Sequence, residues 1–286
     1  MIQKQGLLAL WLNKRYGIPY VTVEHWSGYL SENGQFRRMF KWQRQFYRRI
    51  AASAEIILPV SRRLMDAMHS CRIYNARWGQ IDNVVDDCFF AHSAISHQPS
   101  AVKTLIHVSC FDERSKNVKG LLRAAKMLSE KRRDWRLVLV GYGVDFADVR
   151  RYAEDLDIPD EQLLWTGELA PNEVAEWMHR SDALVLSSRY ETYGVVLAEA
   201  AAAGLPILST PVGIAEEVAD LIVPHEIAQN KPGTFAEFIE SMLWKPTPNP
   251  SLKGGESVSH NTDRFTAKAI GKKLKSVYDS CLHRHI

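Results

Sequence analysis

The feature that most constrains the fold is a regular alternation of short apolar runs and helix-forming segments, which begins near residue 100. The apolar runs are 104–109, 136–143, 162–167, 183–188 and 205–210, and the helix-forming segments between and after them are 117–131, 146–156, 171–181, 195–204 and 214–219. Apolar runs of this length are typical of strands that are buried on both faces. Because strands that alternate with helices favour a parallel sheet covered by helices, the sequence predicts an α/β fold.

The first hundred residues contain fewer strand signals. Only 18–24 and 54–61 have the pattern of strands, and two parallel strands are too few for an independent domain of this type. The sequence therefore predicts an incomplete α/β domain at the start of the chain, followed by a complete one. The expected divisions are a partial N-terminal domain at 1–98, a second domain at 99–245, a Pro-, Gly- and Ser-rich linker at 246–262 and a C-terminal helix at 263–286.

Composition excludes several classes of protein. The chain has 286 residues, of which 46% are hydrophobic and 24% charged, as in a soluble globular protein. Its net charge of +3 is too small to indicate a nucleic-acid partner, and no basic domain or recognition motif is present. The four cysteines are scattered without metal-ligand spacing, so we expect reduced thiols, no metal and a cytoplasmic location. The N-terminus does not have the pattern of a signal peptide.

One short stretch, 187–204, carries two glutamates and a central glycine. Glu191 lies in a predicted strand-to-helix loop, which is where ligands bind in open α/β sheets. Gly194 lets the backbone approach a ligand at the helix start, where unpaired N–H groups favour an anion. Glu199 lies about one turn into the helix. The stretch alone leaves two interpretations open, because a glutamate near a helix start is also a favourable partner of the helix dipole.

Five short stretches of the sequence are informative when they are taken together, in their order along the chain. They are VEHWS (23–27), IDNVVDDCFF (81–90), HVSCFDERSKN (107–117), LVLVGYG (137–143) followed by LWTGEL (164–169), and ETYGVVLAE (191–199). In this order they resemble the family-4 retaining glycosyltransferases, which have the GT-B fold of two Rossmann-like domains. The resemblance implies one complete donor-binding domain and an N-terminal Rossmann-like domain that lacks its first strands.

The resemblance also implies roles for four charged side chains. Glu199 matches the glutamate that holds the ribose of the nucleotide, and Glu191 matches the glutamate beside the donor sugar. Lys116 matches the lysine that neutralises the diphosphate. His25 matches the histidine that faces the donor sugar from the other domain. We therefore expect Glu191, His25 and Lys116 to be catalytic.

Other donor contacts are expected mainly from the backbone. The resemblance implies that Tyr193, Gly194 and Val195 approach the sugar and diphosphate. The loops around Gly143 and Gly167 are expected to contact the base.

The chain departs from the family pattern beside the expected diphosphate. The family usually has an arginine where this chain has Cys110, and Arg114 is the nearest substitute. A shifted arginine is not equivalent where two parallel hydrogen bonds are needed. The turn GIAE (213–216) also lacks one of the two glycines that are common there.

The implied reaction moves a sugar from a UDP- or GDP-sugar to an acceptor hydroxyl with retention of anomeric configuration. The acceptor would be a glycan or a lipid-linked molecule, in the synthesis of polysaccharide, lipopolysaccharide or glycolipid, and no cofactor or metal is required. Three alternatives remain open. The chain could be an inactive nucleotide-sugar-binding relict, a sugar-nucleotide epimerase of the same fold, or a hydrolase that uses Glu191 and Glu199 as its acid and nucleophile.

The segment 36–50 is amphipathic and strongly basic. A helix over this segment would gather apolar residues on one face and arginines and lysine on the other, without an acidic residue. It could lie on the inner face of an anionic membrane, where each basic residue contributes about 1 kcal/mol. We favour the simpler interpretation, in which its apolar face packs into the first domain and its charges are solvated.

Overall fold

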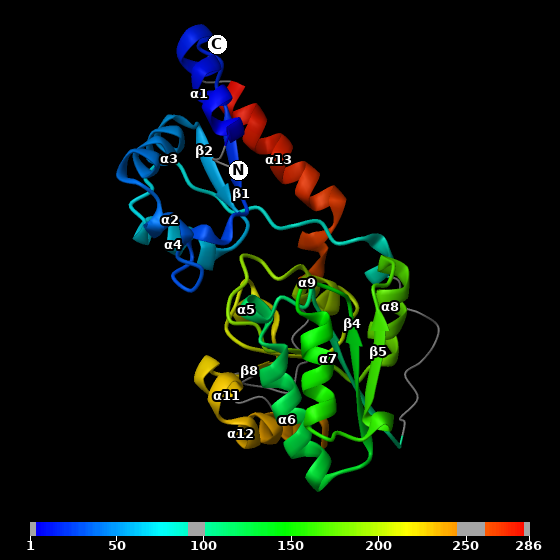
Figure 1. Ribbon diagram of the computed structural model, residues 1–286. Helices are drawn as coiled ribbons and strands as arrows, with labels where there is room; N and C mark the ends of the chain where they lie inside the picture. Colours follow the sequence, from blue (N-terminus) through cyan, green and yellow to red (C-terminus); the bar gives the residue numbers. More distant parts are fainter. Residues whose placement is uncertain (1–3, 91–100, 245–260, 283–286) are drawn as a thin grey trace. The chain divides into compact units, whose positions relative to one another are not determined.

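The computed structural model describes residues 4–90, 101–244 and 261–282 (Figure 1). By its internal contacts the chain forms two compact units. Unit 1 comprises Met1–Val84, Tyr190–Tyr193 and Asp263–Ile286, and unit 2 comprises Val85–Arg189 and Gly194–Thr262. The predicted linker at 246–262 lies almost wholly outside the described residues.

Unit 2 is built on a six-stranded parallel sheet. Its strands are β3 (Lys103–Val108), β4 (Trp135–Val140), β5 (Leu163–Gly167), β6 (Ala183–Leu186), β7 (Ile207–Ser209) and β8 (Leu221–Ile222), in the order β5-β4-β3-β6-β7-β8. The predicted parallel sheet is confirmed, and only the two-residue strand β8 was not predicted. The chain proceeds outward from β3 to β5 and then returns to the other side of β3 with β6. The strand order therefore reverses between β3 and β6, which makes a topological switch point.

The helices of unit 2 are α5 (Glu113–Lys116), α6 (Val118–Lys131), α7 (Phe146–Asp155), α8 (Pro171–Arg180), α9 (Val195–Ala202), α10 (Ala215–Val218), α11 (His225–Asn230) and α12 (Pro232–Trp244). Helices α6 to α10 follow the predicted alternation, and α5, α11 and α12 were not predicted. Helix α6 contacts α7, α11 and α12. The buried core on this side joins α6 to the central strands through residues such as Leu121, Leu128, Trp135, Leu137 and Val185. Burial of these apolar side chains is the main stabilising contribution to the unit.

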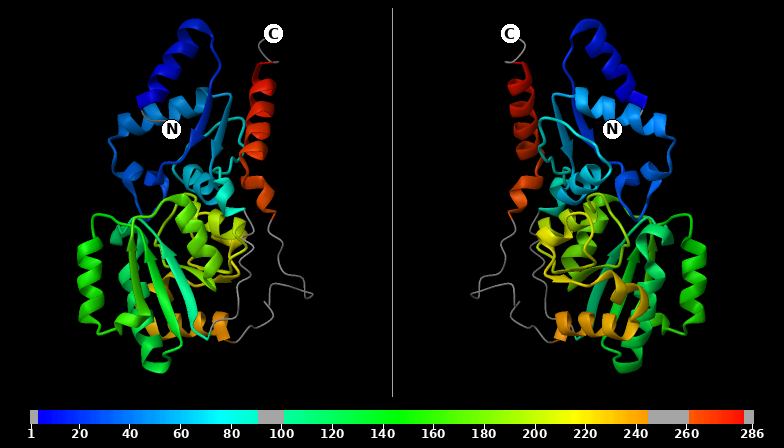
Figure 2. Two further views of the ribbon diagram at one scale, coloured as in Figure 1. Left: turned by 90° about the vertical axis from the view of Figure 1, so that its right-hand side faces the viewer. Right: turned by 90° about the vertical axis from the view of Figure 1, so that its left-hand side faces the viewer.

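Unit 1 contains the two strands that were expected in the first hundred residues. Strand β1 (Val21–Glu24) pairs in parallel with β2 (Ile56–Pro59). The other elements are α1 (Lys4–Tyr16), α2 (Gln35–Arg38), α3 (Lys41–Ser53), α4 (Arg62–Ser70) and α13 (Ala267–Leu282), with short 3-10 turns at η1 (Ser27–Tyr29) and η4 (Thr262–Phe265). Helix α13, the predicted C-terminal helix, lies beside the strands (Figure 2), and Ile270 and Cys281 pack on Ile56 and Leu58.

The prediction of a continuous helix over 36–50 is wrong. The helix breaks at Met39 and Phe40, whose backbones are extended, with ψ of 154° and 150°. The break is stabilised by a side chain, because the Phe40 amide donates to Gln43 Oε1 at 3.0 Å at the start of α3. Phe36 and Ile50 are buried as the simpler interpretation requires. Phe40, however, is 71% exposed, so the apolar face is only partly covered.

No helix among the described ranges 4–90, 101–244 and 261–282 is both long and apolar enough to span a lipid bilayer.

Candidate functional site

The switch point in unit 2 locates the candidate site. Strands β3 and β6 are neighbours, paired at Leu105 with Ala183. The loop after β3 and the loop after β6 both leave the carboxyl edge of the sheet at this point. In open α/β sheets, ligands bind in the crevice between two such loops.

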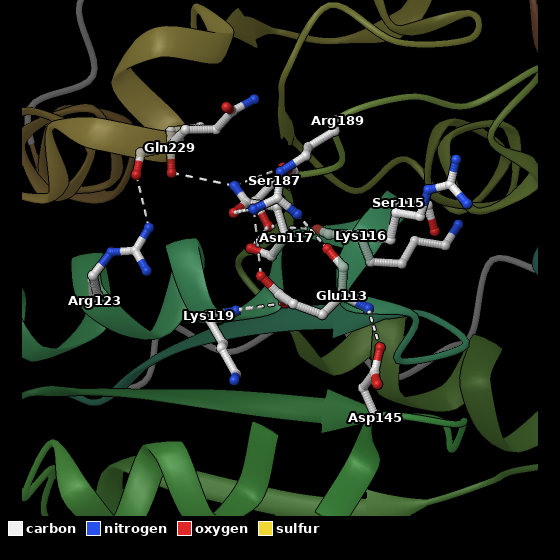
Figure 3. Close-up of polar contacts among 12 residues, drawn as sticks. Glu113, Ser115, Lys116, Asn117, Lys119, Arg123, Asp145, Ser187, Arg189 and Gln229 are labelled. Carbon is white, nitrogen blue, oxygen red and sulfur yellow. Dashed lines mark hydrogen bonds and ion pairs between the residues drawn. The ribbon is translucent and has the colours of Figure 1, made fainter. Parts of the chain in front are cut away.

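The loop after β3 presents Lys116 at the end of the one-turn helix α5. Asp112 caps this turn, with Oδ1 accepting from the Arg114 amide at 3.1 Å. Asn117 ends the turn in the left-handed conformation, with φ of 51°, and the Lys116 carbonyl accepts from Ser187 Oγ at 3.1 Å. The Lys116 side chain points away from Asn117 and its neighbours (Figure 3). The backbone of this lysine is therefore fixed by the end of the turn and by Ser187.

A network of buried and half-buried polar groups ties this loop to the end of β6 (Figure 3). The Arg189 guanidinium donates to Asn117 Oδ1 at 2.9 Å and to the Glu113 carbonyl, and lies 3.5 Å from Glu113 Oε1. The Arg189 amide donates to the Ser115 carbonyl at 2.7 Å. Asn117 Nδ2 in turn donates to the Ser187 carbonyl at 3.2 Å. These bonds join the two loops on either side of the switch point.

Sequence reasoning missed this network. Arg189, Asn117, Glu113 and Ser187 were not predicted as site residues. A usable signal was present, because the polar run Ser187 to Arg189 follows directly on the buried strand β6, at the sheet edge where ligands bind.

Glu199, on the second turn of α9, is electrostatically unusual. Its side chain is half-buried, and burial, followed by the nearby Asp86 carboxylate, raises its pKa to about 7. No hydrogen-bond donor of the described residues contacts the Glu199 carboxylate. A desolvated carboxylate without donors is unfavourable in the folded protein. A ligand that supplies hydrogen-bond donors would stabilise such a carboxylate.

Helix α9 starts at the predicted glycine, and anion binding there stays a prediction. Gly194 is the N-cap of α9 with φ of 77° and ψ of 70°, a conformation that favours glycine. Val195, the first residue of the helix, is 41% exposed. The first N–H groups of a helix have no partner within it and carry a partial positive charge, so they attract an anion. The alanines that follow are buried, which lets α9 pack closely in the unit.

The structure explains why glycine occupies the two positions that were expected to lie near the base. A Cβ at Gly143 would lie 1.6 Å from the Cys110 carbonyl oxygen, so the loops after β3 and β4 touch through backbone at this position. Asp145 reinforces this contact by accepting from the Glu113 amide at 2.8 Å. Gly167 has φ of 72° at the end of β5. Contact of either glycine with a nucleotide base stays a prediction.

The remaining predicted residues belong to unit 1. His25 follows β1, and partial burial lowers the pKa of its imidazole, although the neighbouring Glu24 carboxylate acts in the opposite direction. Tyr193 is buried, and its hydroxyl lies 3.3 Å from Asp82 Oδ1 as a hydrogen-bond donor. Glu191 is in the same short segment, Tyr190–Tyr193. Of the predicted residues, unit 2 contains Lys116, Arg114, Gly194, Val195, Glu199, Gly143 and Gly167, and unit 1 contains His25, Glu191 and Tyr193.

In the part of the chain that the structure describes, no group of three or more His, Cys, Asp or Glu side chains is arranged to hold a metal ion.

Comparison with known proteins gives the family. The model for "Glycosyl transferases group 1" matches residues 91–251, which is more than half of the chain. The chain therefore belongs to the group 1 glycosyl transferase family, as the ordered motifs predicted.

Two curated relatives have informative names. N-acetyl-alpha-D-glucosaminyl L-malate synthase of Bacillus anthracis is 30% identical over 172 residues, which are 58% of this chain and 44% of the relative. Lipopolysaccharide 1,6-galactosyltransferase of Escherichia coli K12 is 29% identical over 175 residues, which are 60% of this chain and 47% of the relative. The matched region thus spans less than half the length of each of these relatives.

Solved structures confirm the fold. Sucrose-phosphate synthase from Thermosynechococcus elongatus aligns with a TM-score of 0.74 at 18% identity, covering 98% of this chain and 72% of that one. The Anabaena protein HepE in complex with UDP and glucose aligns with a TM-score of 0.71 at 16% identity, covering 97% and 76%. The expected GT-B class of fold is confirmed by these similarities.

Proposed function

We propose that the protein is a retaining glycosyltransferase that uses a nucleoside diphosphate sugar, with unit 2 as its donor-binding part. Membership of the group 1 family supports transferase chemistry. The similar fold of HepE, which was solved with UDP and glucose, supports a nucleotide-sugar donor and favours UDP as the nucleotide.

The observation that carries this proposal is the Glu199 carboxylate. It lies next to the switch point, half-buried, with its pKa raised to about 7 and without a hydrogen-bond donor among the described residues. The two hydroxyls of a ribose are adjacent donors that match the two oxygens of a carboxylate. Each such hydrogen bond to a charged acceptor contributes about 1.5–3 kcal/mol. Ribose binding would therefore relieve the unfavourable burial of Glu199.

The diphosphate would be bound by the neighbouring positive groups. Lys116 supplies a full charge from the loop after β3, and the α9 start at Gly194 and Val195 supplies N–H groups and a partial charge. Negative charge grows on the diphosphate as the bond to the sugar breaks, so these groups would stabilise the transition state without a metal. Arg114 is exposed on the same loop and could approach the diphosphate. For Glu191 and His25, the roles implied by the family resemblance stay predictions.

The acceptor is the least constrained part of the proposal. The name of the Escherichia coli relative refers to lipopolysaccharide, which supports an acceptor hydroxyl on a glycan or a lipid-linked sugar. Such an acceptor would suit a cytoplasmic protein that works at the inner face of the membrane.

Calorimetric titration with UDP, GDP and ADP tests the donor site directly. We expect one nucleotide, UDP, to bind the wild type, and Glu199→Gln to weaken that binding by about 2–4 kcal/mol. Glu154→Gln is the matched control, because Glu154 is an exposed glutamate on α7 whose side chain is 68% exposed. Equal affinity of wild type and Glu199→Gln for UDP would remove the ribose assignment.

Product analysis on the same protein separates the alternatives. Nucleotide binding without sugar transfer to any supplied acceptor would support the inactive nucleotide-sugar-binding relict. An epimerase would release free nucleotide and an altered sugar from the nucleotide sugar in the absence of an acceptor. A transferase would form a new glycosidic bond only when an acceptor is supplied.

A further inference from the structure

Unit 1 contains a cavity whose lining is strongly basic. The cavity has a volume of about 540 Å³ and lies among α2, α3 and the turn that follows α4. The described residues that line it are Phe36, Arg37, Lys41, Arg44, Gln45, Arg48, Ser70, Cys71 and Arg72. Five of the nine are cations and none is acidic. We call this the basic cavity.

Three of the four arginines of the basic cavity lie near one residue, Cys71. Burial raises the pKa of the Cys71 thiol, and the guanidinium groups of Arg37, Arg48 and Arg44 act in the opposite direction because they lie close to its sulfur. Arg48 also donates to the Cys71 carbonyl at 3.0 Å. Cys71 itself is buried. Three positive charges from α2 and α3 are therefore held around the same buried residue at the end of α4.

No carboxylate of the described residues neutralises these charges. Within the described ranges, none of the five cations of the basic cavity forms a salt bridge with a carboxylate. The Nε atoms of Arg44 and Arg48 are buried without a hydrogen-bond partner among the described residues. Like charges held close together repel, and a buried donor without an acceptor is unfavourable. Both costs would be removed by an anion with several acceptor oxygens.

We propose that the basic cavity is a binding site for a phosphate-bearing anion. Guanidinium groups match phosphate oxygens with paired, charge-assisted hydrogen bonds. The volume is in the range of small-molecule sites. The site is formed wholly by unit 1, so the proposal does not depend on donor binding in unit 2.

The phosphate could belong to a free compound or to a lipid headgroup. The surface of α3 outside the cavity exposes Trp42 at 61% and Phe46 at 45%, with their rings 6.1 Å apart. Exposed aromatic side chains next to cations are also found where a protein contacts the membrane interface. The test must therefore include a probe of each source.

The probes are inorganic pyrophosphate and vesicles of phosphatidylglycerol, with phosphatidylcholine vesicles as the neutral reference. The pocket variant is Arg37→Gln/Arg44→Gln. Its matched control is Lys14→Gln/Arg62→Gln, which removes the same two charges from exposed positions of unit 1 outside the cavity. Lys116→Gln shows whether a probe binds instead at the proposed diphosphate site of unit 2.

We expect the pocket variant to lose at least about tenfold in affinity for one of the two probes, a change of about 1.4 kcal/mol. The control and Lys116→Gln should keep affinity for that probe within about twofold of wild type, since they leave the basic cavity intact. Loss confined to pyrophosphate identifies a free phosphate compound, and loss confined to phosphatidylglycerol identifies a lipid headgroup. Equal losses in the pocket and control variants, or binding of neither probe by the wild type, would overturn the proposal.

Circular dichroism and thermal unfolding show whether the pocket variant is folded. If it is not, Lys41→Gln/Arg72→Gln replaces it, because both side chains are exposed at the cavity rim. The same loss of affinity is expected from that variant, and an unchanged affinity would overturn the proposal.

Discussion

Replacing Glu199 by glutamine should stabilise the protein above neutral pH while it weakens nucleotide binding. Burial raises the pKa of Glu199 from 4.5 to about 7. The folded protein thus keeps a proton that the unfolded chain releases between these two values. The contribution of Glu199 to the free energy of unfolding is therefore most favourable below pH 4.5 and falls as pH rises through this window.

The size of the effect follows from the same shift. At 1.36 kcal/mol for each pKa unit, the shift corresponds to at most about 3 kcal/mol above pH 7. Because the side chain is only half-buried, solvent screening reduces this to about 1–3 kcal/mol. Glutamine is neutral at every pH, so the variant lacks this pH dependence.

Urea denaturation of wild type, Glu199→Gln and the control Glu154→Gln measures the difference. Near pH 8 we expect Glu199→Gln to be more stable than wild type by about 1–3 kcal/mol, and near pH 4 we expect stabilities within about 0.5 kcal/mol. The control should show no such change. A Glu199→Gln protein that is less stable than wild type near pH 8, or a difference that does not depend on pH, would refute the reasoning. Either result would mean that the folded protein itself satisfies the Glu199 carboxylate.

Three further substitutions test how the site is built. Gly143→Ala places a Cβ 1.6 Å from the Cys110 carbonyl oxygen, so we expect at least about 2 kcal/mol of destabilisation in urea; normal stability would contradict the close backbone contact. Arg189→Lys cannot reproduce the forked contacts with Asn117 and the adjacent loop, and should lower the free energy of unfolding by about 1–3 kcal/mol, with a parallel loss of nucleotide affinity. Burial lowers the pKa of His107 from 6.5 to about 4. The unfolded chain binds this proton first, so wild type should lose about 3 kcal/mol as pH falls from 6.5 toward 4, and His107→Gln should lose correspondingly less.

The fold of unit 2 could be predicted because its signals are local. Each strand from β3 to β7 is a short apolar run, and each helix from α6 to α10 follows it with suitable spacing. Strand β8 has two residues and leaves almost no pattern. The break between α2 and α3 was missed because no proline or glycine marks it. One side-chain hydrogen bond, from the Phe40 amide to Gln43, stabilises the break.

Only part of the candidate site could be predicted from the sequence, because only some of its residues lie in local motifs. Glu199 and Lys116 were predicted as site residues because each lies in a recognisable motif. The Arg189 network was not, because Arg189 and Asn117 are separated by 72 positions along the chain and meet only after β3 and β6 pair. The basic cavity was hidden in the same way, since Arg72 follows α4 while the other four cations lie on α2 and α3. Contacts that depend on tertiary pairing leave no periodic signal in the sequence.

The loop after β6 is divided between the two units, and this limits how the protein can be cut into fragments. The chain passes from one unit to the other after Val84, Arg189, Tyr193 and Thr262. No single cleavage of the backbone yields the two units as separate pieces. A fragment that stopped at residue 84 would lack both the Tyr193 hydroxyl that meets Asp82 and the helix α13 that packs on β2. Gly194, at the start of α9, is one peptide bond from Tyr193 of unit 1. A circular permutant that opens the chain between Tyr193 and Gly194 would keep every residue of the proposed donor site and remove one of the four links between the units. Its nucleotide affinity would measure what this one link contributes.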